Sequence, residues 1–247
     1  MVTSSLQNSP SLRDSNIFAV GFNHSNMKKL ILSVLVFGGV IVAKAQNNSI
    51  GKNDPDAKKI LDQVSAKAKS YKSIQADFTL EVQNAAGKVE GSKKGTVYLK
   101  GTQYHVSITG QEIFCDGKNS WTYDKSTNEV TISKVDPTVK TITPEKFFTD
   151  FYDKDFLYKL NGDVKQGNKT LQEIELTPVD KTKAFYKVYL YVDKATKMIY
   201  SLKSLEKNGA KDILTINKLI GNTAIKDDLF VFNKAKYPGV EEVDLRN

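Results

Sequence analysis

The chain has 247 residues, and its 36 Lys and Arg residues against 28 Asp and Glu residues give a formal charge of +8. Because 40% of the residues are apolar, the chain can form a hydrophobic core, which excludes a disordered tail, a collagen, a polytopic membrane protein and a disulfide scaffold. A single cysteine, Cys115, allows no internal disulfide, and two histidines, His24 and His105, leave little for a metal site or a proton relay.

Residues 27–45 have the features of a cleaved secretory signal peptide. Two lysines precede an apolar run of 13 residues, Leu30 to Val42, and Ala43 and Ala45 stand at the positions that a signal peptidase reads. The run is too short to cross a hydrocarbon core, which needs about 20 residues in a helix. We therefore expect export rather than a membrane anchor.

The rest of the chain divides around this segment. Residues 1–26 are polar and unpatterned, and we expect them to be a non-native upstream extension, with Met27 as the true start. Residues 46–56 are expected to form a linker and residues 57–247 a single domain. Removing residues 1–45 leaves a formal charge of +5, since four basic residues and one acidic residue are lost. This modest excess is spread along the chain, so we expect no nucleic-acid partner.

The domain is expected to open with an amphipathic helix. Asp54 can cap it, Pro55 suits its first position, and apolar residues recur at helical spacing as far as Tyr71. From Ser73 the apolar period changes from about four to two, which predicts a strand over Ile74–Gln83 with one apolar and one polar face.

Short strands separated by turns follow in two groups. Between the groups, Thr143-Pro144-Glu145 starts a short helix that carries four aromatic residues, and a helical turn is expected at Asp227–Leu229. The strands are expected at Gly95–Lys100, Gln103–Thr109, Gln111–Cys115, Ser120–Tyr123, Glu129–Lys134, Lys169–Thr177, Ala184–Val192, Lys197–Glu206, Asp212–Leu219 and Phe230–Asn233.

These elements predict a fold of the α+β class that is mainly β. Ten or eleven antiparallel strands form a large curved sheet, which must cover one face or close on itself. Three helical segments are too few to cover both faces. We expect an incomplete antiparallel β-barrel whose apolar concave face is covered by short helices.

No catalytic constellation is apparent. His105 lies on the polar side of its strand, and Cys115 ends an apolar segment with no second cysteine. Carboxylates such as Asp116, Asp124 and Asp193 stand in turns, where they bond to the local backbone. The chain also lacks a phosphate-binding Gly-rich loop and a helical His-Glu motif. We therefore expect a protein without catalytic residues, bound metal or cofactor.

Several blocks resemble the periplasmic lipoprotein carriers of the LolA type. They are KSIQADFTLEV, KKGTVYLKGTQYHV, FCDGKNSWTYDK, IELTP and FVFNKAKYPGVEEVDLR, and together they span about residues 57 to 246. The resemblance implies an incomplete antiparallel barrel with a helical lid, whose apolar cavity receives the acyl chains of a lipoprotein. It also implies acylated lipoproteins, an inner-membrane release transporter and an outer-membrane acceptor as partners of a monomeric carrier.

On that reading, the acyl chains are covered by apolar residues of the strands and of the aromatic helix, because each CH₂ hidden from water contributes about 0.8 kcal/mol. The aromatic helix is the candidate for a mobile cover. The expected lining is Phe78, Leu80, Val97, Leu99, Trp121, Tyr123, Phe147, Phe148, Phe151, Tyr189 and Leu202.

One position departs from the family pattern. Enterobacterial-type carriers have Lys-Arg-Pro after the strand that matches Val97–Lys100, and their arginine is thought to latch the lid. This chain reads Lys100-Gly101-Thr102. The resemblance therefore extends to fold and ligand class more safely than to the release mechanism.

Two other functions stay open on sequence grounds. A lipocalin-like binder of free lipids or other small apolar ligands needs the same cavity but no lipoprotein. An exported hydrolase using two carboxylates is the weaker alternative, since nothing in the sequence selects a pair.

Overall fold

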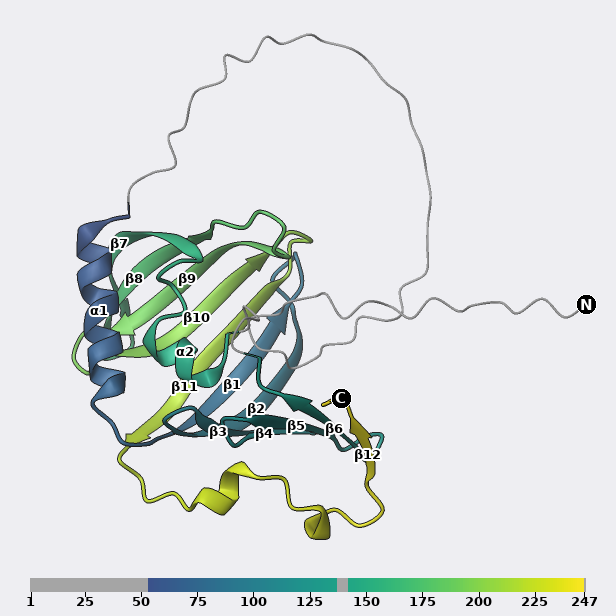
Figure 1. Ribbon diagram of the computed structural model, residues 1–247. Helices are drawn as coiled ribbons and strands as arrows, with labels where there is room; N and C mark the ends of the chain where they lie inside the picture. Colours follow the sequence, from purple (N-terminus) through teal and green to yellow (C-terminus); the bar gives the residue numbers. More distant parts are fainter. Residues whose placement is uncertain (1–52, 137–141, 247) are drawn as a thin grey trace, which may run out of the picture.

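The structure, a computed structural model, describes residues 53–136 and 142–246 (Figure 1). The helices are α1 (Pro55–Lys69) and α2 (Pro144–Thr149), and two 3₁₀ turns, η1 (Asp227–Phe230) and η2 (Lys234–Lys236), follow near the C-terminus. The strands are β1 (Ile74–Gln83), β2 (Val89–Lys100), β3 (Gln103–Ile108), β4 (Gln111–Cys115), β5 (Asn119–Asp124), β6 (Glu129–Lys134), β7 (Phe156–Gln166), β8 (Lys169–Pro178), β9 (Phe185–Asp193), β10 (Met198–Glu206), β11 (Lys211–Gly221) and β12 (Glu241–Asp244).

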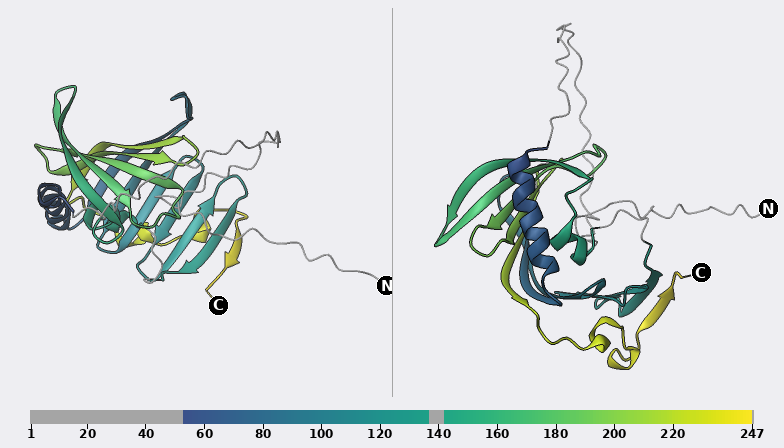
Figure 2. Two further views of the ribbon diagram at one scale, coloured as in Figure 1. Left: turned by 90° about the horizontal axis from the view of Figure 1, so that it is seen from above. Right: turned by 60° about the vertical axis from the view of Figure 1, so that its left-hand side comes forward.

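All these strands belong to one curved, open sheet. Its 12 strands are ordered β12-β6-β5-β4-β3-β2-β1-β11-β10-β9-β8-β7, so the two edges, β12 and β7, do not pair with each other. Neighbours are antiparallel except for β12 and β6, which are parallel. Figure 2 shows α1 and α2 within the curve of the sheet. We call the face toward these helices the inner face and the opposite face the outer face.

The N-terminus of α1 is held by hydrogen bonds to an edge strand. The Asp54 carboxylate accepts hydrogen bonds from the N–H groups of Asp56 (2.9 Å) and Ala57 (3.4 Å) and so caps the helix. It also accepts one from the Leu160 N–H of β7 at 3.0 Å. The hydrogen bond from Leu160, followed by that from Asp56, lowers the pKa of Asp54. The cap therefore joins α1 to β7 as well as starting the helix.

Alternation along the strands makes most of the inner face apolar. Across β1 to β4, directly paired neighbours place Ala76, Val97, Val106 and Ile113 in one row on this face. The first three are buried beneath the helices, and Ile113 packs against the same core while partly exposed. The long strands β8 to β11 continue the apolar surface on the other side of β1.

The polarity of the sheet inverts between β4 and β5. The next members of the same inner-face row are Thr122 on β5 and Thr131 on β6. The large apolar residues of these two strands occupy the alternate positions and lie on the outer face; they are Trp121, Tyr123, Val130 and Ile132. The two faces therefore need covers at different places.

The two covers are separate segments. α1 and α2 pack on the inner face in the main hydrophobic core. Residues 222–246, which we call the C-terminal strap, cross the outer face (Figures 1 and 2). Phe232 and Tyr237 of the strap pack on the sheet, with ring centroids 5.7 Å from Phe114 and 4.5 Å from Tyr123, respectively. The strap ends in β12, which pairs with β6.

The expected fold class is confirmed. The described chain is mostly β with few helices, and its open curved sheet forms an incomplete barrel with helices over the inner face. The predicted helix starts at Asp54 and Thr143 are confirmed as N-caps. β4 and β6 have the predicted bounds.

The strand count and some boundaries differ from the prediction. The sheet has 12 strands rather than ten or eleven. β7 was hidden because a bulge between Leu160 and Gly162 breaks its alternation, and β12 has only 4 residues. The expected strand Phe230–Asn233 is wrong, because η1 ends in Phe230, whose buried ring packs where η1 meets β3 and β4. β2 begins at Val89, before the expected Gly95.

The N-terminal boundaries are only partly covered by the structure. α1 begins at Pro55, inside the expected linker of residues 46–56. The expected extension at residues 1–26 and signal peptide at residues 27–45 lie outside the described residues.

Gly95 occupies a position in β2 that has no room for a side chain. A Cβ there would lie 2.5 Å from Phe78 Cζ and 2.6 Å from the Ser107 carbonyl oxygen, whereas one at Gly91 would meet nothing within 4 Å. We predict that Gly95→Ala lowers the free energy of unfolding by about 1–3 kcal/mol through overpacking. Gly91→Ala, the control in the same strand, should change it by less than about 1 kcal/mol. Urea denaturation measures both, and equal effects would contradict this packing.

Candidate functional site

α2 presents aromatic side chains to the inner face. Thr143 caps the helix by accepting a hydrogen bond from the Lys146 N–H at 3.3 Å, and Pro144 occupies the first turn. Phe147 and Phe148 are 1% and 2% exposed, and their ring centroids lie 5.1 Å apart. This helix of 6 residues therefore places both rings in the main core.

The space beneath α2 is apolar and almost filled. Its free volume is about 20 Å³, which is room for about one water molecule. Its lining comes from β1, β2, β3, β11 and α2 and consists of Phe78, Val97, Val106, Pro144, Phe147, Phe148, Leu214 and Ile216. An acyl chain fits there only if α2 moves away from the sheet.

The structure brings eight of the eleven expected lining residues together on the inner face. Four of them line the space beneath α2, namely Phe78, Val97, Phe147 and Phe148. Four others belong to the same core or pack against it, namely Leu80, Leu99, Phe151 and Leu202. Displacement of α2 would therefore uncover a continuous apolar surface.

Four lining residues were not among those expected. They are Val106, Pro144, Leu214 and Ile216. Pairing supplies the missing signal for one of them, since Val106 is the direct neighbour of Val97 across β2 and β3. Leu214 and Ile216 alternate along β11 and could have been found from its period of two.

Three expected lining residues lie on the outer face, so their placement in the cavity is wrong. Trp121 and Tyr123 belong to the small core under the C-terminal strap. The Tyr189 ring lies beneath the Lys203 ammonium, with 5.0 Å from Nζ to the ring centroid, and Lys203 pairs with Tyr189 across β10 and β9. Alternation shows which residues share a face, but it does not say which face is concave.

The turn Lys100-Gly101-Thr102, which stands where enterobacterial-type carriers have Lys-Arg-Pro, contacts the C-terminal strap. Gly101 adopts a φ of 60° in the connection between β2 and β3, and a Cβ at this position would meet nothing within 4 Å. The neighbouring Lys100 extends to the strap, where its Nζ lies 2.6 Å from Asp227 Oδ1. This turn therefore contacts the outer cover, and Lys100 contributes an exposed ion pair rather than an arginine latch.

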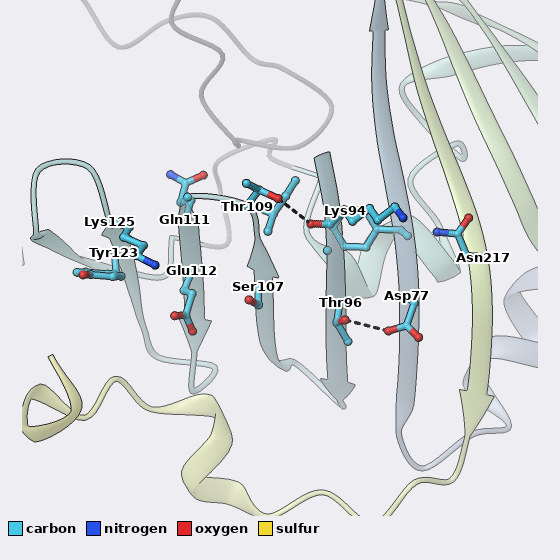
Figure 3. Close-up of a pocket in the computed structure, with 14 residues that line it drawn as sticks. Asp77, Lys94, Thr96, Ser107, Thr109, Gln111, Glu112, Tyr123, Lys125 and Asn217 are labelled. Atoms are coloured by element: carbon cyan, nitrogen blue, oxygen red, sulfur yellow. Dashed lines mark hydrogen bonds between the residues drawn. The ribbon is translucent and has the colours of Figure 1, made fainter. Parts of the chain in front are cut away.

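An open trough of about 620 Å³ lies on the outer face. Figure 3 shows Asp77, Thr96, Ser107 and Glu112 side by side on neighbouring strands, and these residues are directly paired. Thr96 Oγ1 donates a hydrogen bond of 2.8 Å to Asp77. Two carboxylates, two lysines and several hydroxyl groups line the trough. Such a lining favours water and does not suit an acyl chain.

A polar network connects the trough to the strap. His105 Nε2 lies 3.0 Å from Glu112 Oε2, and the His105 ring stacks on Phe114 at 4.2 Å between centroids. The hydrogen bond with His105 lowers the pKa of Glu112, and a further one from the Tyr237 hydroxyl acts in the same direction. Burial, with the neighbouring Glu112 charge, raises the pKa of Tyr237 to about 12. These groups anchor the strap to β3 and β4.

The described residues show neither an activated thiol nor a metal-binding group. Burial raises the pKa of the Cys115 thiol and outweighs the opposite effect of the hydrogen bond that the sulfur accepts from the Gly117 N–H at 3.4 Å. The thiol is therefore poorly suited to act as a nucleophile. Among residues 53–136 and 142–246, no group of three or more His, Cys, Asp and Glu side chains could hold a metal ion. No helix in the same part of the chain is long and apolar enough to cross a bilayer.

Comparison with known proteins gives consistent matches. The family model described as outer membrane lipoprotein carrier protein LolA matches residues 69–233. An outer-membrane lipoprotein carrier protein of Cupriavidus necator is 27% identical over 183 residues, covering 71% of this chain and 84% of that protein.

A solved structure shares the fold. An uncharacterized conserved protein from Thermus thermophilus aligns with a TM-score of 0.53 and 17% identity, covering 76% of this chain and 99% of that one. A LolA superfamily protein from Nitrosomonas europaea aligns with a TM-score of 0.38 and 15% identity, covering 71% of this chain and 97% of that one.

Acid should weaken the attachment of the strap through Glu112. Because its pKa in the folded protein lies below the ordinary value of 4.5, the charged carboxylate stabilises the fold above about pH 4.5. This contribution is lost as the pH falls through the lowered pKa. We predict that Glu112→Gln destabilises the protein at pH 6 but makes little difference at pH 2.5, as measured by urea midpoints. An equal loss at both pH values would contradict this role.

Proposed function

The chain belongs to the LolA family of outer membrane lipoprotein carrier proteins, and from this premise we propose that it is an exported lipoprotein carrier. It shields the acyl chains of its cargo on the inner face of the sheet and transfers them across the periplasm to the outer membrane. It loads from an inner-membrane transporter and unloads to an outer-membrane acceptor. It performs no catalysis.

The apolar inner face beneath α2 is the observation that carries the proposal. Val97 and Val106 form its floor, and Phe147 and Phe148 of α2 occupy the space above them. The part of the cover above these two valines is α2, a helix of 6 residues. The large trough on the outer face is polar, so the inner face is the better receptor for hydrocarbon.

Because the acyl chains of the cargo would replace α2 as the cover of the inner face, binding of the cargo stays reversible. Each acyl CH₂ removed from water contributes about 0.8 kcal/mol, so lipoprotein acyl chains need a cover in an aqueous compartment. Moving the buried rings of Phe147 and Phe148 into water opposes binding by about 1.5–3 kcal/mol each. The net affinity is therefore lower than burial of the chains alone would give, and α2 returns when an acceptor withdraws the cargo.

Binding of a triacylated lipopeptide tests this function. The protein from residue 46 onward should form a soluble, detergent-free complex with the lipopeptide on gel filtration, but none with the same peptide lacking acyl chains. Absence of a complex with the lipopeptide would contradict the carrier function. If free fatty acid alone formed a complex, the chain would instead be a binder of small apolar ligands.

Two phenylalanines on opposite faces provide a matched pair of variants. Phe148 under α2 is 2% exposed and Phe114 on the outer face is 5% exposed, so truncation of either should destabilise the fold by about 3–5 kcal/mol. Only Phe148→Ala opens space on the inner face and weakens the competing cover. We predict that it tightens lipopeptide binding about tenfold, while Phe114→Ala leaves the Kd within about twofold. Titration with a fluorescent lipopeptide, below the denaturation temperature of both variants, measures this difference. Equal shifts in Kd would contradict displacement of α2.

A further inference from the structure

The inner face changes from apolar to hydroxyl-bearing along its cross-strand rows. One row runs through directly paired neighbours from β1 to β6, with Ala76, Val97, Val106 and Ile113 followed by Thr122 and Thr131. The next row ends in the same way, because Cys115 on β4 is followed by Ser120 on β5 and Ser133 on β6. The change falls between β4 and β5 in both rows.

Ser120, Thr122, Thr131 and Ser133 form what we call the hydroxyl patch. All four are partly buried. Among the described residues, none of their hydroxyl groups has a hydrogen-bond partner. The large apolar residues of β5 and β6 lie on the outer face, under the strap, so the hydroxyl patch is the whole inner-face surface at the middle of these two strands.

The hydroxyl patch is continuous with the space beneath α2. Val106 lines that space, and Ile113 and Thr122 are the next two residues of its row. With strands about 4.8 Å apart, Thr122 lies about 10 Å from Val106 along the sheet. A ligand whose hydrocarbon part lay beneath α2 would place its other end near the patch.

Two carboxylates at the edge of the hydroxyl patch limit which chemical group of a ligand can bind there. Asp124 and Glu129 are directly paired on the inner face, beside Thr122 and Thr131. The hydrogen bonds from Ser126, first through its side chain and then through its backbone, lower the pKa of Asp124, so it stays ionised at neutral pH. No lysine or arginine stands on the inner side of β5 or β6. A phosphate group would meet two carboxylates here, and the charge of Lys93 on the inner face of β2 already acts on one of them, Asp124.

We propose that the hydroxyl patch binds the uncharged, ester-bearing glyceryl end of a diacylglyceryl-cysteine, with the acyl chains directed from β5 toward β1. The inference rests on the proposed carrier function and deepens it by orienting the cargo. Ester carbonyl groups are acceptors without charge, and the hydroxyl groups of Thr122 and Thr131 donate to them. Partial burial strengthens these hydrogen bonds relative to water. The paired carboxylates disfavour anionic phospholipids, which carry the same acyl chains.

Ester and ether analogues of one lipopeptide test the orientation. The two differ only in the carbonyl groups, and the full domain from residue 46 should bind the ester form about five- to tenfold more tightly. Thr122→Val/Thr131→Val should remove this preference while leaving the Kd of the ether form within about twofold. Thr79→Val/Thr215→Val, the same change in directly paired threonines of the outer face, should keep the preference.

Each other outcome has a distinct meaning. Failure of the wild-type chain to bind either analogue would overturn the proposed function and the inference together. Equal binding of both analogues by the wild type would overturn the inference alone. So would equal weakening of both by Thr122→Val/Thr131→Val, since a merely structural role has no preference for a carbonyl. Vesicles of phosphatidylglycerol should compete poorly with the ester lipopeptide, and efficient competition would also overturn it.

Discussion

An open sheet with an apolar inner face must have that face covered, and this constraint governs the rest of the structure. The row through Val97 and Val106 is too apolar to face water. Because β7 and β12 do not pair, the sheet does not close over this surface. α1 and α2 supply the cover, and Phe147 and Phe148 fill the space beneath α2 almost completely. The carrier function proposed here is an exchange of that cover for acyl chains.

The two covers of the sheet are attached in different ways. The C-terminal strap is joined to β6 by the backbone pairing of β12, to β4 by edge-to-face contacts between aromatic rings and to β2 by the Lys100–Asp227 ion pair. α2 has 6 residues and pairs with no strand, so it is held mainly by apolar side-chain packing. Packing of this kind is non-directional and can be replaced by another apolar surface. The inner cover is therefore the element suited to move, while the outer cover is fixed to the sheet by backbone pairing.

Period-two alternation and helix caps predict the open β-rich fold, the cap at Asp54 and the aromatic helix after Thr143. They also group most inner-face residues correctly, because Phe78 and Val97 alternate along their own strands. Alternation and helix caps do not predict that the polarity of the two faces inverts between β4 and β5. Trp121 has the pattern of any other apolar strand residue, and only its pairing with Phe114 places it on the outer face. The fit of α2 over Val106 and Ile216 depends on tertiary packing that local patterns do not encode. The fold was therefore easier to predict from the sequence than the residues of the candidate site.

The movement of α2 can be measured directly by electron paramagnetic resonance between two spin labels. One label replaces Glu145 on α2 and the other replaces Lys203 on the outer face of β10, with Cys115 changed to Ala. Saturation with triacylated lipopeptide should shift the interspin distance distribution to longer values, and removal of the cargo should restore the original one. A distribution that stays unchanged while the lipopeptide is bound would contradict the exchange of covers.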